Sequence, residues 1–295
     1  MSFLWTLSEL RTPFLDQVFQ YITYLGQELV PIIVICALYW CYNKKLATTI
    51  GFTYVTSGLL VQGLKITFRI PRPWVLDPDF EPVESAIAAA TGYSFPSGHT
   101  QSATSLFAPL ALFFKKWWQK LLCIAAFLLV GLSRMYLGVH TPKDVCTAII
   151  LTSIVALIIW KCQNYFEDPA YTKRISCVIS GVTVLFCIYA YSLYYMGMIE
   201  QHYVADCYKM AGAAIGFAIG WYLERTKLQF STEDCTKKEL LIRLIVGIIL
   251  TVIIYVVPKL LPFEFLLWKM IRYAVVIFWI VYGYPYLFTR YRKQQ

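Results

Sequence analysis

Long apolar blocks separated by short charged loops run through most of the chain, and they restrict its fold more than any other feature. A helix needs about 20 mostly apolar residues to cross a bilayer. In lipid, every backbone N–H and C=O must find a partner within its own segment, which favours helices. With 59% hydrophobic and only 15% charged residues, the chain could hardly cover a water-soluble globule. The pattern therefore predicts an all-α, polytopic membrane helix bundle.

We predict about nine transmembrane helices, at residues 26–42, 47–66, 98–114, 119–138, 143–161, 175–198, 208–224, 241–257 and 265–288. Ahead of them, residues 1–24 mix aromatic and charged side chains, a pattern typical of an amphipathic helix in the membrane interface. No basic stretch precedes an apolar run in this segment, so we expect no cleaved signal peptide.

Membrane topology accounts for the net charge of +9. Alternate loops of the predicted bundle differ in basic content, and the richer set includes Lys44, Lys45, Lys115 and Lys116. Cytoplasmic loops carry an excess of Lys and Arg, so this set is expected to face the cytoplasm. We therefore expect contact with membrane lipids and no nucleic-acid partner.

Three clusters of polar residues lie at the ends of predicted spans, all on the less basic, extracytoplasmic side. In the first, Pro71 and Pro73 stop the second span and force an extended backbone on the residues before them. Lys65 then lies on the last helical turns, and Arg72 follows in the loop. Two interpretations are open: these cations extend to the lipid headgroups, or they form a functional site, since charges at membrane depth are costly.

The second cluster, Pro96-Ser97-Gly98-His99, enters the third span. The first N–H groups of a helix lack partners and attract anions, and glycine allows a close approach to the backbone. In the simpler interpretation Ser97 only caps the helix and His99 is an interfacial histidine. In the other, the helix start binds an anion to which His99 donates a proton.

The third cluster joins the fourth and fifth spans and contains Arg134, His140 and Asp144. Thr141 to Asp144 resembles a capping box with proline at the first helical position. Asp144 therefore caps the helix, or it accepts the Nδ1–H of His140 and leaves Nε2 free to attack. Both roles can coexist, because a carboxylate has two oxygens. Together the three clusters offer a nucleophile, an orienting carboxylate, a proton donor and three cations.

The three clusters together resemble the signature of the type-2 phosphatidic acid phosphatase superfamily. Lys65 to Pro73 fits K-x6-R-P, Pro96 to His99 fits P-S-G-H, and Ser133 to Asp144 fits S-R-x5-H-x3-D. The nine-span layout is similar to that of glucose 6-phosphatase and the sphingosine-phosphate phosphatases. On this basis we expect an interfacial segment over residues 1–24, a phosphatase core over 25–199, and additional transmembrane helices over 200–295, where no motif occurs.

The resemblance implies a phosphoric monoester hydrolase with a histidine nucleophile. His140 attacks phosphorus and forms a phosphohistidine, Asp144 orients it, and His99 protonates the leaving oxygen and then activates water. The phosphate-binding residues implied are Lys65, Arg72, Arg134, Ser97 and Gly98. No metal or other cofactor is implied. The acidic run Asp77, Asp79, Glu81 and Glu84 is interpreted as a solvated loop, because no histidine or cysteine joins it.

A site at the outer ends of spans suits a lipid phosphate, such as phosphatidate, a sphingoid-base phosphate or a polyprenyl (di)phosphate. Sugar phosphates remain an alternative because glucose 6-phosphatase shares the layout. A phosphoryl-headgroup transferase is a second alternative. An anion or lipid transporter is the alternative from another class, but it needs polar or broken helices near the midplane. The plasma membrane, the endoplasmic reticulum and any oligomeric state all stay open.

One stripe of small residues, Gly212, Gly216 and Gly220, lies inside the seventh predicted span. Glycines four residues apart fall on one helix face and let a second helix approach closely. We interpret them as a packing surface rather than as part of a transport path.

Overall fold

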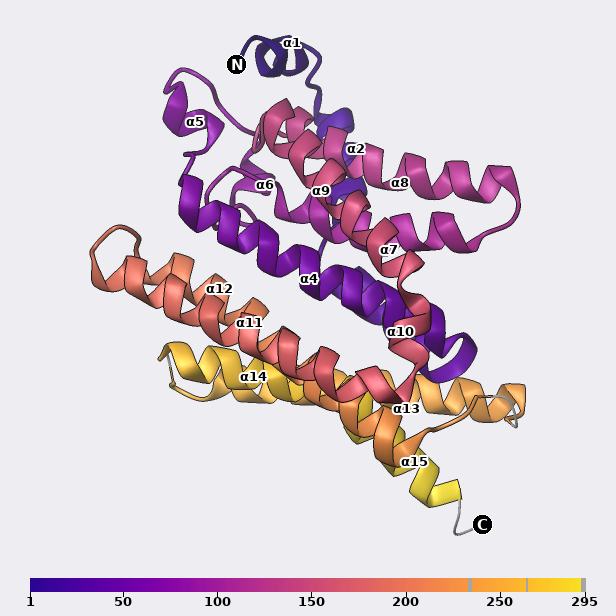
Figure 1. The fold of residues 1–295 in the computed structure, drawn as a ribbon. Helices are drawn as coiled ribbons and strands as arrows, with labels where there is room; N and C mark the ends of the chain where they lie inside the picture. The colour runs from indigo at the N-terminus through magenta and orange to yellow at the C-terminus, as the bar shows by residue number, and fades with distance from the viewer. Residues whose placement is uncertain (233–234, 264, 293–295) are drawn as a thin grey trace. The chain divides into compact units, whose positions relative to one another are not determined.

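The computed structural model describes all residues except 233–234, 264 and 293–295, and its regular structure there is entirely helical (Figure 1). Two compact units are present. The first comprises Met1–Ile32 and Thr56–Trp160, and the second comprises Ile33–Val55 and Lys161–Gln295. The predicted all-α membrane fold is thereby confirmed, while the division into residues 1–24, 25–199 and 200–295 stays a prediction.

The first unit contains all three polar clusters. Its helices are α1 (Ser2–Glu9), α2 (Pro13–Tyr24), the last part of α4 (Lys44–Phe68), α5 (Pro73–Leu76), α6 (Glu84–Ile87), α7 (Gly98–Phe113), α8 (Trp117–Tyr136) and α9 (Pro142–Lys161). Helices α7 and α8 form an antiparallel pair joined by a short turn (Figure 1).

The second unit contains the C-terminal helices and the start of α4. It comprises most of α3 (Leu29–Ala37), η1 (Leu38–Tyr42), α10 (Gln163–Glu167), α11 (Pro169–Tyr195), α12 (Gln201–Leu223), η2 (Glu224–Leu228), α13 (Lys237–Val256), η3 (Val257–Leu260), α14 (Leu266–Phe278), η4 (Trp279–Gly283) and α15 (Tyr284–Arg292).

The glycine stripe packs α12 against α14 in this second unit. A Cβ added to Gly212 would lie 2.1 Å from the carbonyl oxygen of Met270, and one added to Gly216 would lie 2.2 Å from that of Ala274. No side chain fits at such distances, so the two backbones approach as closely as glycine allows. The packing interpretation of the stripe is confirmed.

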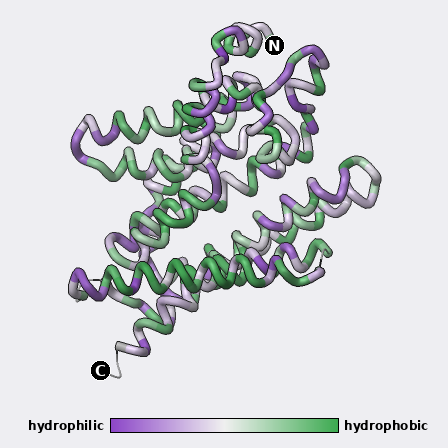
Figure 2. The backbone as a smooth tube through the Cα atoms, turned by 180° about the vertical axis from the view of Figure 1, so that it is seen from behind, coloured by the Kyte–Doolittle hydropathy of each residue, from purple (hydrophilic) through white to green (hydrophobic). Residues whose placement is uncertain are grey.

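Five described helical stretches are long and apolar enough to cross a membrane: Trp117–Tyr136, Pro142–Lys161, Pro169–Tyr195, Lys237–Leu260 and Leu266–Tyr291. A sixth is present if Pro13–Tyr24 and Leu29–Tyr42 are one broken span. Hydrophobic residues line these helices, and hydrophilic residues gather at the turns (Figure 2). Every predicted span overlaps a helix, but the count of nine is not confirmed.

The N-terminal segment forms two helices rather than one. Thr12 caps the second helix, α2: its hydroxyl accepts a hydrogen bond from the Leu15 N–H. Pro13 follows at the first helical position. An extended N-cap followed by proline is a strong helix start, so the chain changes direction there. Both helices belong to the unit that carries the polar clusters.

Candidate active site

The first cluster is positioned by the end of α4. The left-handed backbone of Arg69 (φ 51°) ends the helix, while the Arg69 N–H still donates to the Lys65 carbonyl. Arg72 then caps α5 in an extended conformation, with Pro73 at the first helical position. Lys65 and Arg72 are only 7% and 8% exposed, which argues against side chains that simply extend to the headgroups.

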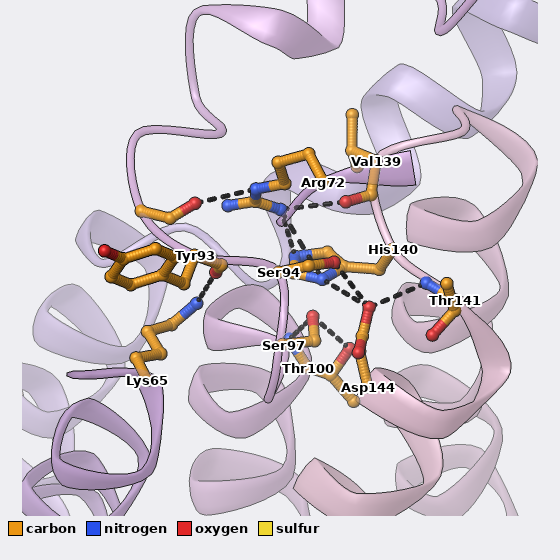
Figure 3. Close-up of polar contacts among 11 residues, drawn as sticks. Lys65, Arg72, Tyr93, Ser94, Ser97, Thr100, Val139, His140, Thr141 and Asp144 are labelled. Atoms are coloured by element: carbon orange, nitrogen blue, oxygen red, sulfur yellow. Dashed lines mark hydrogen bonds and ion pairs between the residues drawn. The ribbon is translucent and has the colours of Figure 1, made fainter. Parts of the chain in front are cut away.

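Backbone carbonyls hold both cations in place (Figure 3). Lys65 Nζ donates to the Tyr93 carbonyl, and Arg72 Nε donates to that of Gly92 at 2.8 Å. Arg72 Nη1 donates to the Val139 carbonyl at 2.8 Å and lies 2.9 Å from His140 Nε2. One guanidinium therefore connects the loop before α7 with the loop before α9.

The second cluster forms the start of α7, as both interpretations of it expect. Ser97 is its N-cap, and the Thr100 hydroxyl donates to Ser97 Oγ at 2.9 Å. A Cβ added to Gly98 would meet no neighbouring atom of the described residues within 4 Å, so open space adjoins the first turn of the helix. The Nε2 atom of His99 is buried and has no hydrogen-bond partner among the described residues. Burying a polar atom costs free energy unless it forms a hydrogen bond, which a bound ligand could supply here.

Arg134 lies on the last turn of α8 and is fully buried. Its Nη1 donates to Thr23 Oγ1 at 2.9 Å, whereas Nε and Nη2 have no partner in the described part of the chain. Gly138 follows in a left-handed conformation (φ 76°), where Arg11 and Phe80 would collide with any Cβ. This glycine lets the chain turn from α8 toward His140.

Asp144 both caps α9 and faces the histidine. Its Oδ2 accepts hydrogen bonds from Ser94 Oγ at 2.6 Å and from the Thr141 N–H at 2.8 Å. His140 Nδ1 lies 3.5 Å from the same oxygen (Figure 3). The capping role is therefore observed, whereas the orienting role of Asp144 toward His140 stays a prediction. Arg72 Nη1 lies 2.9 Å from Nε2 and 3.5 Å from Nδ1, so the guanidinium lies against the imidazole beside both ring nitrogens.

The surroundings of His140 favour its neutral form. Burial lowers the pKa of its imidazole well below the ordinary value, and the charges of Arg72, Lys65 and Arg134 lower it further. A neutral imidazole has a lone pair available for attack. The side chain is 1% exposed, so water has little access to it.

The structure thus brings the predicted residues together. Arg72 contacts His140, the Ser97 N–H donates to the Asp144 carbonyl at 3.1 Å, and Asp144 lies beside His140. Lys65, His99 and Arg134 are within electrostatic reach of His140. The third histidine, His202, is in the second unit, where it pairs with Glu200 at 3.4 Å. In the acidic run, the Asp77 carboxylate accepts from the Trp5 indole and the Glu81 carbonyl from Arg11.

Several contributors were missed by the sequence reasoning. Ser94 is buried and contacts Asp144. Its position in the sequence, three residues before Ser97, could have marked it as a site residue. Thr23 contacts Arg134 across 111 residues, and no local pattern marks it. The carbonyls of Gly92 and Tyr93 act through the backbone, which leaves no side-chain signal in the sequence.

The chain thus combines an all-helical fold, helices long enough to span a membrane and a buried cluster of cations and histidines. Residues 46–168 match the family model of the PAP2 superfamily, and residues 208–295 match that of the PAP2 superfamily phosphatase transmembrane extension. The chain belongs to the PAP2 superfamily.

Curated relatives are lipid phosphatases. Phosphatidylglycerophosphatase B of Bacillus subtilis is 33% identical over 150 residues, which cover 46% of this chain and 69% of that protein. Human sphingosine-1-phosphate phosphatase 2 is 26% identical over 216 residues, which cover 70% of this chain and 51% of that protein. The chain thus spans about half the length of this sphingosine-phosphate relative.

Among solved structures, a transmembrane PAP2 type phosphatidylglycerolphosphate phosphatase from Bacillus subtilis is similar, with 27% identity and a TM-score of 0.45. The similarity covers 55% of this chain and 83% of that structure.

Proposed function

We propose that this chain hydrolyses a lipid phosphomonoester through a phosphohistidine formed on His140, without a metal ion. The observation that carries the proposal is the orientation of His140. Its Nδ1 faces Asp144 at 3.5 Å, and its Nε2 lies 2.9 Å from a guanidinium nitrogen of Arg72. A phosphoryl oxygen bound to Arg72 would therefore bring phosphorus close to His140.

The buried cations suit a phosphoryl dianion. Arg134 has two nitrogens with no partner among the described residues, and Arg72 and Lys65 lie around the same histidine. Gly98 leaves the start of α7 open to an anion, and Ser97 shapes that start. Phosphoryl transfer depends mainly on positioning and on stabilising spread negative charge, which three fixed cations supply.

The reaction balances in two steps. In the first, the Nε2 lone pair of His140 bonds to phosphorus while the P–O bond to the leaving group breaks, and His99 gives its proton to the leaving oxygen. In the second, His99 takes a proton from water, the water oxygen bonds to phosphorus, and the N–P bond breaks. Asp144 stabilises the positive imidazole through Nδ1–H.

A lipid is the proposed substrate because the names of the relatives refer to phosphatidylglycerophosphate and sphingosine 1-phosphate, and because the cluster lies at helix ends. The alkyl chains of such a substrate stay in the bilayer while its phosphate reaches the cluster. The loop charges favour an extracytoplasmic site, which faces either the outside of the cell or a lumen.

The test is phosphate release by the purified, detergent-solubilised protein. The panel holds phosphatidic acid, sphingosine 1-phosphate, a polyprenyl diphosphate and glucose 6-phosphate. We expect release from a lipid monoester that is abolished in His140→Ala and retained in His202→Ala, the matched control in the second unit. Orthovanadate should inhibit, since it mimics five-coordinate phosphorus, and chelators should have no effect.

Other outcomes would replace parts of the proposal. Release from glucose 6-phosphate alone would replace the lipid substrate. Phosphate transfer to an added alcohol without release would identify a transferase. Loss of activity with a chelator and recovery with magnesium would contradict the metal-free mechanism.

A further inference from the structure

Helix α2 packs against the end of α8 that carries Arg134. The Phe19 ring stacks on that of Tyr136 at 4.0 Å, and the Tyr136 hydroxyl donates to the Asp16 carboxylate at 2.9 Å. Asp16, Phe19 and Thr23 follow one another at spacings of three and four residues, so they share one helix face. All three lie outside the residues that match the PAP2 superfamily model.

Thr23 lies near the C-terminal end of this face. It is 1% exposed, and its Oγ1 accepts the hydrogen bond from Arg134 Nη1 at 2.9 Å. A guanidinium is planar, so a bond that fixes Nη1 also fixes the direction of the opposite edge, formed by Nε and Nη2. Those are the two nitrogens with no partner among the described residues.

The turn after α2 is held just as closely. A Cβ added to Gly26 would lie 2.5 Å from the His99 carbonyl oxygen and 2.8 Å from a methyl group of Val130. Helix α2 and its turn therefore contact both the first turn of α7 and the side of α8. Thr23 therefore lies on a helix whose C-terminal end is packed against both α7 and α8.

We propose that Thr23 is a positioning residue that directs the Nε–Nη2 edge of Arg134 toward the phosphoryl group. The inference rests on the proposed function, in which Arg134 binds phosphoryl oxygens. Without the acceptor, Nη1 would be a buried charged donor without a partner, and the side chain would rotate to satisfy it at the expense of the anion. The N-terminal helix would thus complete the anion site that the three motifs begin.

Binding of orthovanadate tests this independently of turnover. Its affinity is measured from the thermal stabilisation of the purified full chain at increasing vanadate concentrations. Thr23→Val removes the acceptor at nearly constant volume and should weaken vanadate binding about tenfold, as expected for loss of a hydrogen bond to a charged group. Thr23→Ser keeps the hydroxyl and should bind within about twofold of the unsubstituted protein.

Thr152→Val is the matched control. Thr152 is a fully buried residue of α9 whose hydroxyl has no partner in the described part of the chain, so vanadate affinity should not change. In an Arg134→Ala background, Thr23→Val should have no further effect, because the hydroxyl acts only through that arginine. If Thr23→Val does not fold, Thr23→Ala is measured in the same way.

The two proposals fail differently. If the unsubstituted protein is not stabilised by vanadate, the anion site itself is contradicted, and the role of Thr23 with it. If the unsubstituted protein binds vanadate and Thr23→Val binds it equally well, only the role of Thr23 is overturned. An equal loss of affinity in Thr23→Val and Thr152→Val would also overturn it, because the effect would then be general to the fold.

Discussion

Ser94 Oγ lies 2.6 Å from Asp144 Oδ2, whereas His140 Nδ1 lies 3.5 Å from the same oxygen. The carboxylate that faces the histidine is therefore held most closely by a serine from the loop before α7. The Ser94 N–H in turn donates to the Ile70 carbonyl at 2.8 Å. This residue links the loop after α4 to the start of α9, so all three clusters are coupled through it.

Ser94→Ala should lower kcat about tenfold. Loss of the hydroxyl removes one of the bonds that fix the carboxylate, and a hydrogen bond to a charged group contributes about 1.5–3 kcal/mol. Ser94→Thr should retain most activity. The control is Ser105→Ala, since among the described residues the buried Ser105 hydroxyl bonds only to the Ser102 carbonyl of its own helix. If steady-state kinetics give Ser94→Ala a kcat within twofold of that of the control, Ser94 does not have this role.

Gly98→Ala should fold normally but bind phosphate poorly. A Cβ at this position meets no packing neighbour within 4 Å in the described part of the chain, so the methyl group projects into the space at the start of α7. If that space holds the phosphoryl group, we expect kcat/KM to fall by at least about tenfold, because the helix N–H groups can no longer be approached.

Gly181→Ala is the matched control for this substitution. A Cβ on Gly181, in α11, also meets no atom within 4 Å, so the chemical change and the local space are the same. It should leave activity unchanged. Equal kcat/KM for both variants would place the phosphate elsewhere, and thermal unfolding of each would show that the chain is intact.

Activity should depend on pH as a bell-shaped curve, because one histidine must be neutral and the other protonated. Burial first, then Arg72, Lys65 and Arg134, lower the pKa of His140 below its ordinary value of about 6.5. Its protonation at falling pH removes the nucleophile, so the acid limb of kcat/KM should lie below that value.

The direction of this shift is testable. Lys65→Met removes a positive charge, which makes protonation of His140 easier and raises its pKa. The acid limb should therefore move to higher pH, even though activity is reduced. An unchanged limb, or one displaced to lower pH, would show that another group controls it. A flat profile from mildly acidic to mildly basic pH would contradict two-histidine chemistry.

The sequence predicted the helical membrane class because long apolar blocks have few other solutions. It also selected residues that the fold then brought together, such as Lys65, Arg72 and His140. The count of spans was not established. Helices α4 and α12 are long enough but too polar to be among the five clear candidates, and α7 has only 16 residues. A criterion of apolarity alone does not identify spanning helices that carry polar residues on a face turned toward the protein interior.

Other features were out of reach for a physical reason. The carbonyls of Tyr93 and Val139 bind the cations, but every residue has a carbonyl, so their sequence positions carry no information. Thr23 reaches Arg134 only because α2 folds back on α8, a contact between segments 111 residues apart. Reasoning from local spacing finds motifs, whereas these contacts depend on how the helices pack.

A phosphohistidine should be trapped when the second step is slowed. His99→Asn removes the group proposed to activate water, so labelled phosphate from the substrate should stay on the protein longer. Its bond should be cleaved by acid and resist alkali, as an N–P bond does and a phosphoserine does not. Rapid quenching followed by electrophoresis under alkaline conditions measures the label.

The label should be absent in His140→Ala and unchanged in His202→Ala, since His202 pairs with Glu200 in the second unit. A leaving group that needs no proton, such as a nitrophenolate, lets the first step proceed in His99→Asn, so the test does not depend on both roles of His99. Hydrolysis with no labelled protein at any time point, in either the unsubstituted chain or His99→Asn, would favour direct attack of water on phosphorus. His140 would then act as a base rather than as the nucleophile.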